Sequence, residues 1–154
     1  AIKTVPGATP RAAKEATPTP RPEPGQFTNV KVEVTIIDQR GSQPAINKTV
    51  SLTVAERGTG QIRSEGRVRV AKEQYGVRLA VDLIRPVIEG NKVHATLAVS
   101  YDTPATGDET TLNTDVRHSL TVVLESGKAV TIAESADPAA DRRVALQVKA
   151  TILR

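Results

Sequence analysis

Hydrophobic and polar residues alternate along this chain from Phe27 to the C-terminus, and nowhere do they follow a sustained helical spacing. The first segment places Val30, Val32, Val34 and Ile36 on one face, with polar residues between them. Apolar residues at every second position are typical of a strand with one face in a core and the other in water. The pattern recurs along the chain and predicts about eight strands between residues 27 and 154.

The spacing of turn residues indicates how these strands pack. Glycine, proline, asparagine and aspartate interrupt the alternation at intervals of about 8–12 residues, which favours an antiparallel, Ig-like β-sandwich. A parallel sheet with both faces covered is excluded, because its strands would be apolar on both sides. We therefore predict an all-β antiparallel sandwich, with a closed barrel as the alternative.

Several local features refine this prediction. Turn residues at Glu89–Lys92 and at Glu125–Lys128 predict two hairpins. Gly66 in the middle of the third strand indicates a bulge or a close backbone approach. The fourth strand should end at Pro86, and a loop should cover residues 102–109. Six mid-strand residues on apolar faces are predicted to be buried: Val34, Leu52, Val81, Leu97, Val122 and Leu146.

The first 26 residues differ from the rest of the chain. They hold six of the ten prolines and no aromatic residue, and Ile2 and Val5 are their only bulky aliphatic side chains. Such a segment cannot bury enough apolar surface to offset its ordering entropy, so alone it should be disordered or extended as polyproline II. We predict an extended arm over 1–26 and a sandwich domain over 27–154. The arm residues expected to serve in assembly are Ile2, Val5, Pro6, Pro18, Pro20, Pro22 and Pro24.

Composition excludes several classes of chemistry. The chain has no cysteine, so disulfides, zinc–thiolate sites, iron–sulfur clusters and thiol nucleophiles are ruled out. Aromatic residues make up only 2%, which disfavours stacking on sugars or unpaired bases. The net charge is +4, of which the arm and the domain each carry +2, and such a small surplus on the domain is no signature of polyanion binding. No apolar run reaches the length of a membrane-spanning helix. An opening at Ala1, in a chain without methionine, is expected of an exported product after signal-peptide removal.

The two histidines are the first candidates for catalysis or metal binding. The pattern puts His94 on the polar face of the fifth strand and His118 among the apolar residues of the sixth. No metal-binding spacing surrounds either, so a structural role is favoured for both, and no metal or cofactor is expected. A Ser-His-Asp triad assembles in space, so sequence order leaves it open, but Ser126-Gly127 lies in a turn rather than at a nucleophile elbow. We expect no enzymatic activity.

Charged residues cluster at three further places. The acidic loops 102–109 and 137–141 could bind calcium, but neither has the dense ligand spacing of a calcium loop, and turn chemistry explains them equally well. Basic residues on the third and fourth strands could bind a polyanion or an envelope surface, or they could protect an exposed sheet edge. Acidic residues interleave with them, which favours the edge. These basic residues are Arg63, Arg67, Arg69, Lys72 and Arg78.

Part of the chain resembles a known family. Residues 77–153 resemble the C-terminal β-domain of outer-membrane secretins, on the segments Arg85-Pro86-Val87-Ile88, Leu97-Ala-Val-Ser and Leu120-Thr-Val-Val-Leu-Glu-Ser-Gly127. The double glycine that follows the last hairpin in that family is absent, so the resemblance implies a fold and no activity. The domain is also similar to small exported β-proteins of Acidobacteria, which implies export.

Two functions agree with these features. The favoured one is a non-enzymatic structural subunit of an extracellular or cell-surface homopolymer, in which the arm adds a strand to a sheet edge of a neighbouring copy. An extended arm of this length would reach roughly 80 Å at about 3.1 Å per residue. The alternative is an exported binding or accessory module, in the periplasm or at the surface, tethered by a flexible arm.

Overall fold

The computed structural model describes residues 28–70, 72–106, 111–138 and 141–154, and within these ranges it contains strands and turns but no helix. The all-β prediction is confirmed. The predicted arm over 1–26, with all of its expected assembly residues, lies outside the described residues. The strands are β1 (Asn29–Arg40), β2 (Ile46–Ala55), β3 (Thr59–Val70), β4 (Glu73–Glu89), β5 (Lys92–Thr106), β6 (Thr111–Glu125), β7 (Ala129–Ala136) and β8 (Arg142–Leu153).

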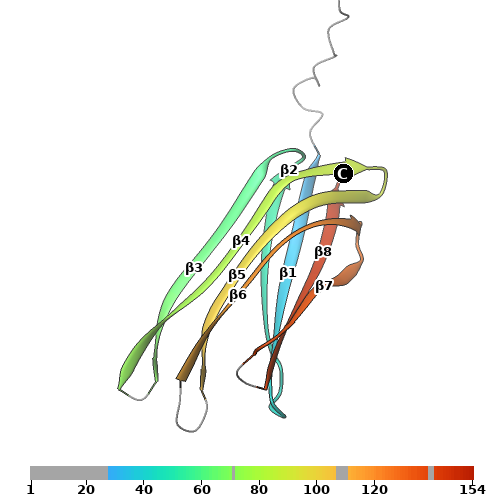
Figure 1. The fold of residues 1–154 in the computed structure, drawn as a ribbon. Coiled ribbons are helices and arrows are strands. Elements are labelled where there is room, and N and C mark those ends of the chain that lie inside the picture. Colours follow the sequence, from blue (N-terminus) through green and yellow to red (C-terminus); the bar gives the residue numbers. More distant parts are fainter. Residues whose placement is uncertain (1–27, 71, 107–110, 139–140) are drawn as a thin grey trace, which may run out of the picture.

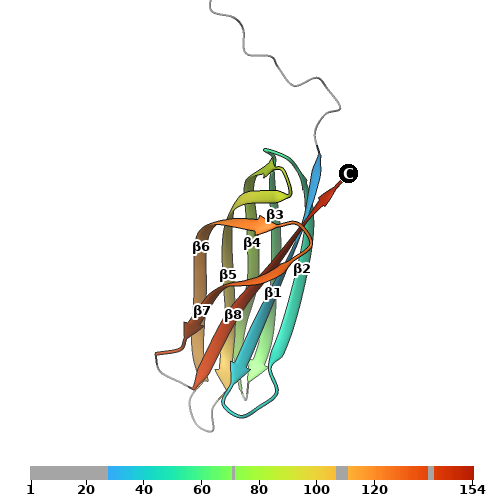
Figure 2. The same cartoon turned by 90° about the vertical axis from the view of Figure 1, so that its right-hand side faces the viewer.

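The strands form two antiparallel four-stranded sheets that face each other as a sandwich (Figure 1 and Figure 2). One sheet has the order β2-β1-β8-β7 and the other the order β3-β4-β5-β6. The second sheet is a simple meander, and the chain crosses between the sheets from β2 to β3 and from β6 to β7. No strand pairing joins the two sheets in the described ranges, so the sandwich holds and the barrel alternative is wrong.

The core lies between the sheets and consists mainly of aliphatic side chains. Val30 to Ile36 of β1 contribute four fully buried residues at alternate positions. Val122 was expected in the core but is only half-buried, because β6 is an edge strand and one flank of its inner face stays open. The other five predicted core residues are buried: Val34, Leu52, Val81, Leu97 and Leu146.

The two predicted hairpins have different outcomes. Glu89 pairs with Lys92 across the turn that joins β4 to β5, and Gly90 has the positive φ of 63° that such a turn requires, so this hairpin is confirmed. At Glu125–Lys128 the turn also forms, with the Lys128 amide donating to the Glu125 carbonyl over 3.1 Å. However, β6 and β7 belong to different sheets, so the prediction of a hairpin there is wrong. The turn carries the chain from one layer to the other.

Two irregularities also differ from expectation. The register of β3 against β4 is continuous through Gly66, which pairs with Val77, so no bulge occurs there. The irregularity lies in β4, between Ile84 and Val87, and β4 runs through Pro86 instead of ending at it. A strand tolerates proline at such a bulge, because the missing N–H is not needed for the ladder. Similarly, β5 continues to Thr106, so most of the predicted loop 102–109 is strand.

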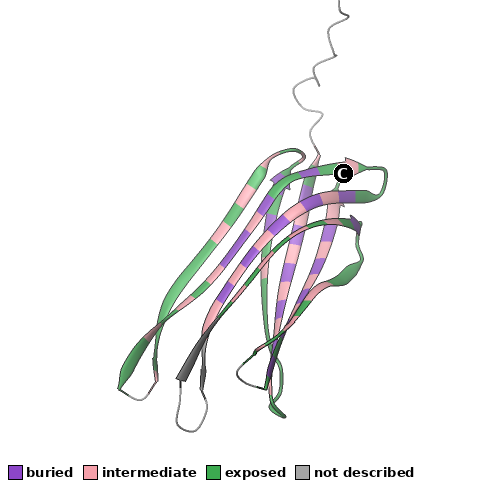
Figure 3. Ribbon diagram, in the orientation of Figure 1, coloured by how far each residue is buried: buried purple, intermediate pink, exposed green. Residues whose placement is uncertain are grey.

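Burial decreases along the second sheet toward the end opposite the chain termini (Figure 3). There the hairpin of β3 and β4 is largely exposed, whereas the central strands β1 and β8 alternate regularly between buried and half-buried residues. No helix that could cross a membrane occurs in the residues that the structure describes.

Candidate functional site

A buried ionic cluster lies at the end of the core opposite the chain termini. Asp38 follows Ile36 in the inward alternation of β1, and Arg142 precedes Val144 in that of β8, so the pleat turns both side chains into the sandwich. Asp38 is 1% exposed and Arg142 is 3% exposed. The alternation that predicts the core also places Asp38 and Arg142 on the inward face of their strands. Sequence reasoning missed them because charged residues are not expected in a core.

One carboxylate organises this cluster. Arg142 binds Asp38 in a bidentate manner, from Nε to Oδ1 over 2.9 Å and from Nη2 to Oδ2 over 3.0 Å. Arg40 donates from Nη2 to Oδ2 over 3.0 Å, and the Tyr101 hydroxyl donates to the same oxygen over 3.1 Å. The Arg142 guanidinium also lies 5.9 Å from the centre of the Tyr101 ring. The cluster therefore fixes β1, β5 and β8 relative to one another.

The cluster also changes how its members titrate. Burial alone would raise the pKa of Asp38, but hydrogen bonds from Arg142 and Arg40 outweigh it and lower that pKa. The pKa of Tyr101 is raised, first by burial and then by the negative charge of Asp38. An ionised, fully engaged carboxylate is suited to holding strands together and not to proton transfer.

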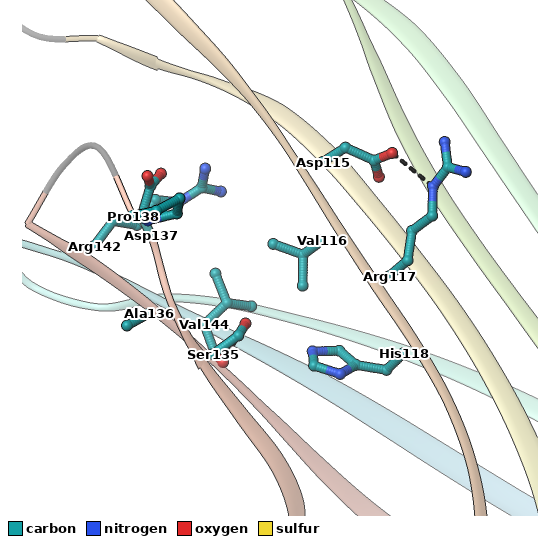
Figure 4. Close-up of a pocket in the computed structure, with 10 residues that line it drawn as sticks. All are labelled: Asp115, Val116, Arg117, His118, Ser135, Ala136, Asp137, Pro138, Arg142 and Val144. Atoms are coloured by element: carbon teal, nitrogen blue, oxygen red, sulfur yellow. Dashed lines mark hydrogen bonds and ion pairs between the residues drawn. The ribbon is translucent and has the colours of Figure 1, made fainter.

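A cavity of about 200 Å³ opens beside the cluster, between β6 and the β7–β8 region (Figure 4). Val116 and His118 of β6 form one wall, and Ser135, Arg142 and Val144 form the other. The Nε2 atom of His118 and the Nη1 atom of Arg142 are both buried without a hydrogen-bond partner. His118 thus lies on the apolar face as predicted, but it also lines a cavity that sequence reasoning missed.

His94 occupies the outer face, as expected. Its Nε2 atom lies 2.9 Å from an Oε2 atom of Glu89, which forms a surface ion pair when the imidazole is protonated. No group of three or more metal-ligating side chains occurs in the part of the chain that is described. Ser126 accepts a hydrogen bond from the Ile152 amide over 3.0 Å, so it stabilises the β6–β7 turn rather than serving as a nucleophile.

The described parts of the two acidic segments considered for calcium lie in a strand and in turns of the sandwich. Asp102 is paired with Asp115 across β5 and β6, and its pKa is raised by burial and then by the charge of Asp115. The Asp137 amide donates to the Arg142 carbonyl, and the Asp141 carbonyl accepts from the Gly41 amide over 2.8 Å. Residues 107–110 and 139–140 lie outside the described ranges, so the two predicted loops are only partly observed.

Most of the basic residues considered for polyanion binding lie on or next to the edge strand β3, whereas Arg78 lies on β4 inside the sheet. Arg63 pairs with Asp82 over 2.6 Å, and Arg78 lies 3.9 Å from Glu65. Arg67 and Arg69 are exposed on β3, and Lys72 is exposed in the turn after it. Because β3 is an edge strand, the placement agrees with the interpretation that these charges protect an edge. Binding of a polyanion there stays a prediction.

Comparisons with known proteins identify the fold. No family model and no curated protein matches the chain. Among solved structures, the type II secretin GspD of enteropathogenic Escherichia coli is similar with a TM-score of 0.58 and 12% identity, over 84% of this chain and 70% of that one. GspD in the ETEC pilotin–secretin complex with AspS gives 0.57 and 11%, over 84% and 50% of the two chains. The type II secretin XcpQ of Pseudomonas aeruginosa gives 0.54 and 12%, over 83% and 59%.

At these identities the likeness shows the fold alone. It agrees with the predicted resemblance to the secretin β-domain, and it extends beyond residues 77–153 because it covers 84% of the chain. The resemblance to exported β-proteins of Acidobacteria stays a prediction. This chain spans only 50% and 59% of the second and third of these secretins.

Proposed function

We propose that this chain is a non-enzymatic structural domain of a cell-envelope assembly, which joins copies of itself through the free edges of the sheet β3-β4-β5-β6. The observation that carries this proposal is the direction of the two edge strands. In a four-stranded meander, β3 and β5 run one way and β4 and β6 the other. The free edges on β3 and β6 therefore run in opposite directions, so β3 of one copy can add to β6 of the next as an ordinary antiparallel neighbour.

This contact is head-to-tail and leaves one free edge at each end of the pair. A head-to-tail contact repeats until the array closes into a ring or grows as an open polymer. Both strands are long enough for such pairing, with 12 residues in β3 and 15 in β6, whereas β7 in the other sheet has only 8. The sheet β3-β4-β5-β6 is therefore the favoured route of association.

The basic side chains on β3 restrict this pairing without preventing it. Arg67 and Arg69 disfavour an arbitrary strand, because charged residues on an edge oppose uncontrolled addition. Such repulsive elements are how a specific interface rejects wrong partners. The arm over 1–26 supplies a second, longer connection in this account, in which Ile2 and Val5 dock on a neighbour. The similarity to secretins in fold supports placing the protein in the envelope.

A second candidate function is an exported binding or accessory module. One observation favours it, namely the cavity of about 200 Å³ between β6 and the β7–β8 region.

Two matched substitutions test the edge proposal. Val68 and Val130 are both on edge strands, both face the inner side of their sheets, and they are 41% and 44% exposed. Val68→Lys places an ammonium group where an added strand would bury it, and such burial of an unpaired charge is costly. Val130→Lys makes the same change on β7, the short edge strand of the other sheet.

We expect the full chain and Val130→Lys to form species larger than a monomer in sedimentation velocity as concentration rises. Val68→Lys should remain a monomer with an unchanged circular dichroism spectrum. Equal assembly of the two variants would contradict the proposal.

A further inference from the structure

Two arginines occupy backbone positions that glycine usually takes. Arg57 has a φ of 63° and Arg85 a φ of 43°, and they are the only non-glycine residues with a positive φ in the described ranges. A positive φ strains any residue that has a Cβ, and residues held in this way cluster at functional sites. Each position therefore keeps a cationic side chain in spite of backbone strain.

Both positions belong to tight local structures. The Gly58 amide donates to the Ala55 carbonyl over 2.8 Å, so Arg57 is the third residue of the turn between β2 and β3. A turn with a positive φ at its third residue favours glycine or asparagine there. Arg85 lies in the irregularity of β4, directly before Pro86, and glycine is the usual residue at a positive φ in a bulge. In both places a glycine would adopt the same backbone without strain.

Backbone hydrogen bonds hold the two arginines next to each other. The Arg57 amide donates to the Pro86 carbonyl over 2.7 Å, and the Arg85 amide donates to the Gly58 carbonyl over 2.9 Å. This reciprocal pair joins the β2–β3 turn to β4 at the end of the sandwich that carries the C-terminus (Figure 1). Two guanidinium groups thus start from adjacent, fixed backbone positions, which lowers the entropy lost when both bind one surface.

The charge of this arginine pair is not neutralised. Both side chains are exposed, and neither forms an ion pair in the part of the chain that the structure describes. The acidic side chains closest to them in sequence have partners of their own, which are the Ile88 amide for Glu56, Arg63 for Asp82 and His94 for Glu89. The pair is therefore suited to phosphate groups, which guanidinium groups bind through charge-assisted hydrogen bonds.

Exposed aliphatic side chains flank Arg85. Ile84 and Val87 on either side of it are each 39% exposed, and Val123 of β6, in the same cross-strand row as Val87, is 55% exposed. Arginines beside exposed aliphatic residues are typical of a surface that lies on an anionic membrane, where the cations bind lipid phosphates and the apolar side chains enter the headgroup boundary. A free phosphate would not contact the aliphatic side chains, so a lipid is the favoured source of the phosphate.

We propose that this end of the sandwich docks on an anionic phospholipid surface, with Arg57 and Arg85 binding lipid phosphates and with Ile84 and Val87 at the headgroup boundary. The inference is independent of edge pairing, because it concerns the end of the sandwich and not the pairing of a free strand.

Flotation of the full chain with lipid vesicles measures this contact. We expect binding to vesicles of phosphatidylcholine mixed with phosphatidylglycerol, none to phosphatidylcholine alone, and weaker binding as salt rises. Arg57→Gln and Arg85→Gln should each lower the partition coefficient about fivefold, which is the contribution of one cation near an anionic surface. Arg143→Gln is the matched control, because Arg143 is exposed on β8 at the opposite end of the sandwich, and it should lower the coefficient less than about twofold.

Glycine variants separate a binding role from a structural one. Arg57→Gly and Arg85→Gly relieve the positive φ, so each should leave the melting temperature unchanged or raise it, while vesicle binding falls as much as in the glutamine variants. A lower melting temperature in both glycine variants would show that the arginines serve to stabilise the fold. That result, or an equal loss of binding in Arg143→Gln, would overturn the proposal.

Inorganic phosphate separates a lipid from a soluble source of the phosphate group. Saturable shifts of the Arg57 and Arg85 amide signals with phosphate in two-dimensional NMR, without flotation on the mixed vesicles, would assign the pair to a soluble ligand and overturn docking on lipid. Flotation that depends on both arginines supports the proposal whether or not free phosphate binds. Absence of binding to both probes would contradict it.

Discussion

The strands β1 and β3 are both 12 residues long, but their inner faces differ. The inner face of β1 is aliphatic from Val30 to Ile36, whereas that of β3 includes Ser64 and Gly66. The aliphatic side chains of β1, from Val30 to Ile36, are fully buried, whereas in β3 Ile62 is half-buried and Val68 is largely exposed. Position adds to this difference in sequence, because β1 has a strand on each side and β3 has one free flank. Alternation therefore defines a strand and its faces, while the place of the strand in the sheet decides what it contributes.

The comparison between central and edge strands extends to ion pairs, where we expect the largest change in the free energy of unfolding. Asp38 joins the central strands β1 and β8 in full burial, whereas Asp82 pairs with Arg63 near the open edge. Asp38→Ala leaves Arg142 buried without its counter-ion and should cost about 3–5 kcal/mol. Asp82→Ala should change stability by about 1 kcal/mol or less, since exposed pairs contribute little. Denaturant unfolding of both variants checks the contrast, and similar losses would contradict the assigned difference in burial.

Truncation of apolar side chains should show the same difference between a central strand and an edge strand. Leu146 is buried on the central strand β8, and Leu146→Ala should lower the free energy of unfolding by about 2–5 kcal/mol. Ile62→Ala on β3 should cost less than about 2 kcal/mol, because its site is open and leaves no closed cavity. The measurement is the urea midpoint at unchanged slope. If Ile62→Ala lowered the free energy of unfolding by more than this amount, the β3 edge would be covered in solution.

Two glycines of the β3–β4 hairpin allow a crowded and an open position to be compared within one sheet. A Cβ at Gly60 would meet the Val54 side chain and come within 2.9 Å of a Leu52 methyl, where β3 enters the sandwich next to β2. Gly60→Ala should therefore destabilise by about 1–3 kcal/mol through overpacking. A Cβ at Gly76 meets nothing within 4 Å, and Gly76→Ala should be neutral or stabilise by about 0.4–1 kcal/mol. In thermal unfolding, Gly60→Ala should lower the melting temperature, whereas Gly76→Ala should leave it unchanged or raise it.

The pH dependence of stability gives the smallest effect and tests two carboxylates whose pKa values are shifted in opposite directions, Asp38 and Asp102. The pKa of Asp38 is lower in the folded state than the unfolded value of about 3.9. Its contribution is therefore present above about pH 4 and is lost as pH falls through the folded pKa. Asp102 has a raised pKa and acts in the opposite direction, with its contribution lost as pH rises above the unfolded value. Unfolding measured from pH 2.5 to 6 should show a shallower acid slope in Asp38→Asn and a steeper one in Asp102→Asn.

These contrasts also explain how much of the molecule could be predicted from sequence. The strands, their faces and five of the six named core residues follow from alternation, which is a local property. The turns at Gly90 and Gly127 look alike in sequence, but only the first joins paired strands. Which strands pair depends on contacts far apart in the chain, and the same holds for the meeting of Asp38 with Arg142. The cavity could not be predicted, because it depends on the separation of β6 from β7.

The most direct test of the central claim uses the absence of cysteine in this chain. Arg63→Cys or Arg67→Cys on β3 is mixed under oxidising conditions with Arg117→Cys or Thr121→Cys on β6, all outward-facing and exposed. Neighbouring antiparallel strands bring Cα atoms to about 4.5–5.5 Å, within reach of a disulfide. We predict disulfide-linked dimers for at least one mixture of a β3 with a β6 variant, and none for either variant alone. Dimers that form only between two β3 variants or two β6 variants, or no dimers in any mixture, would contradict the account.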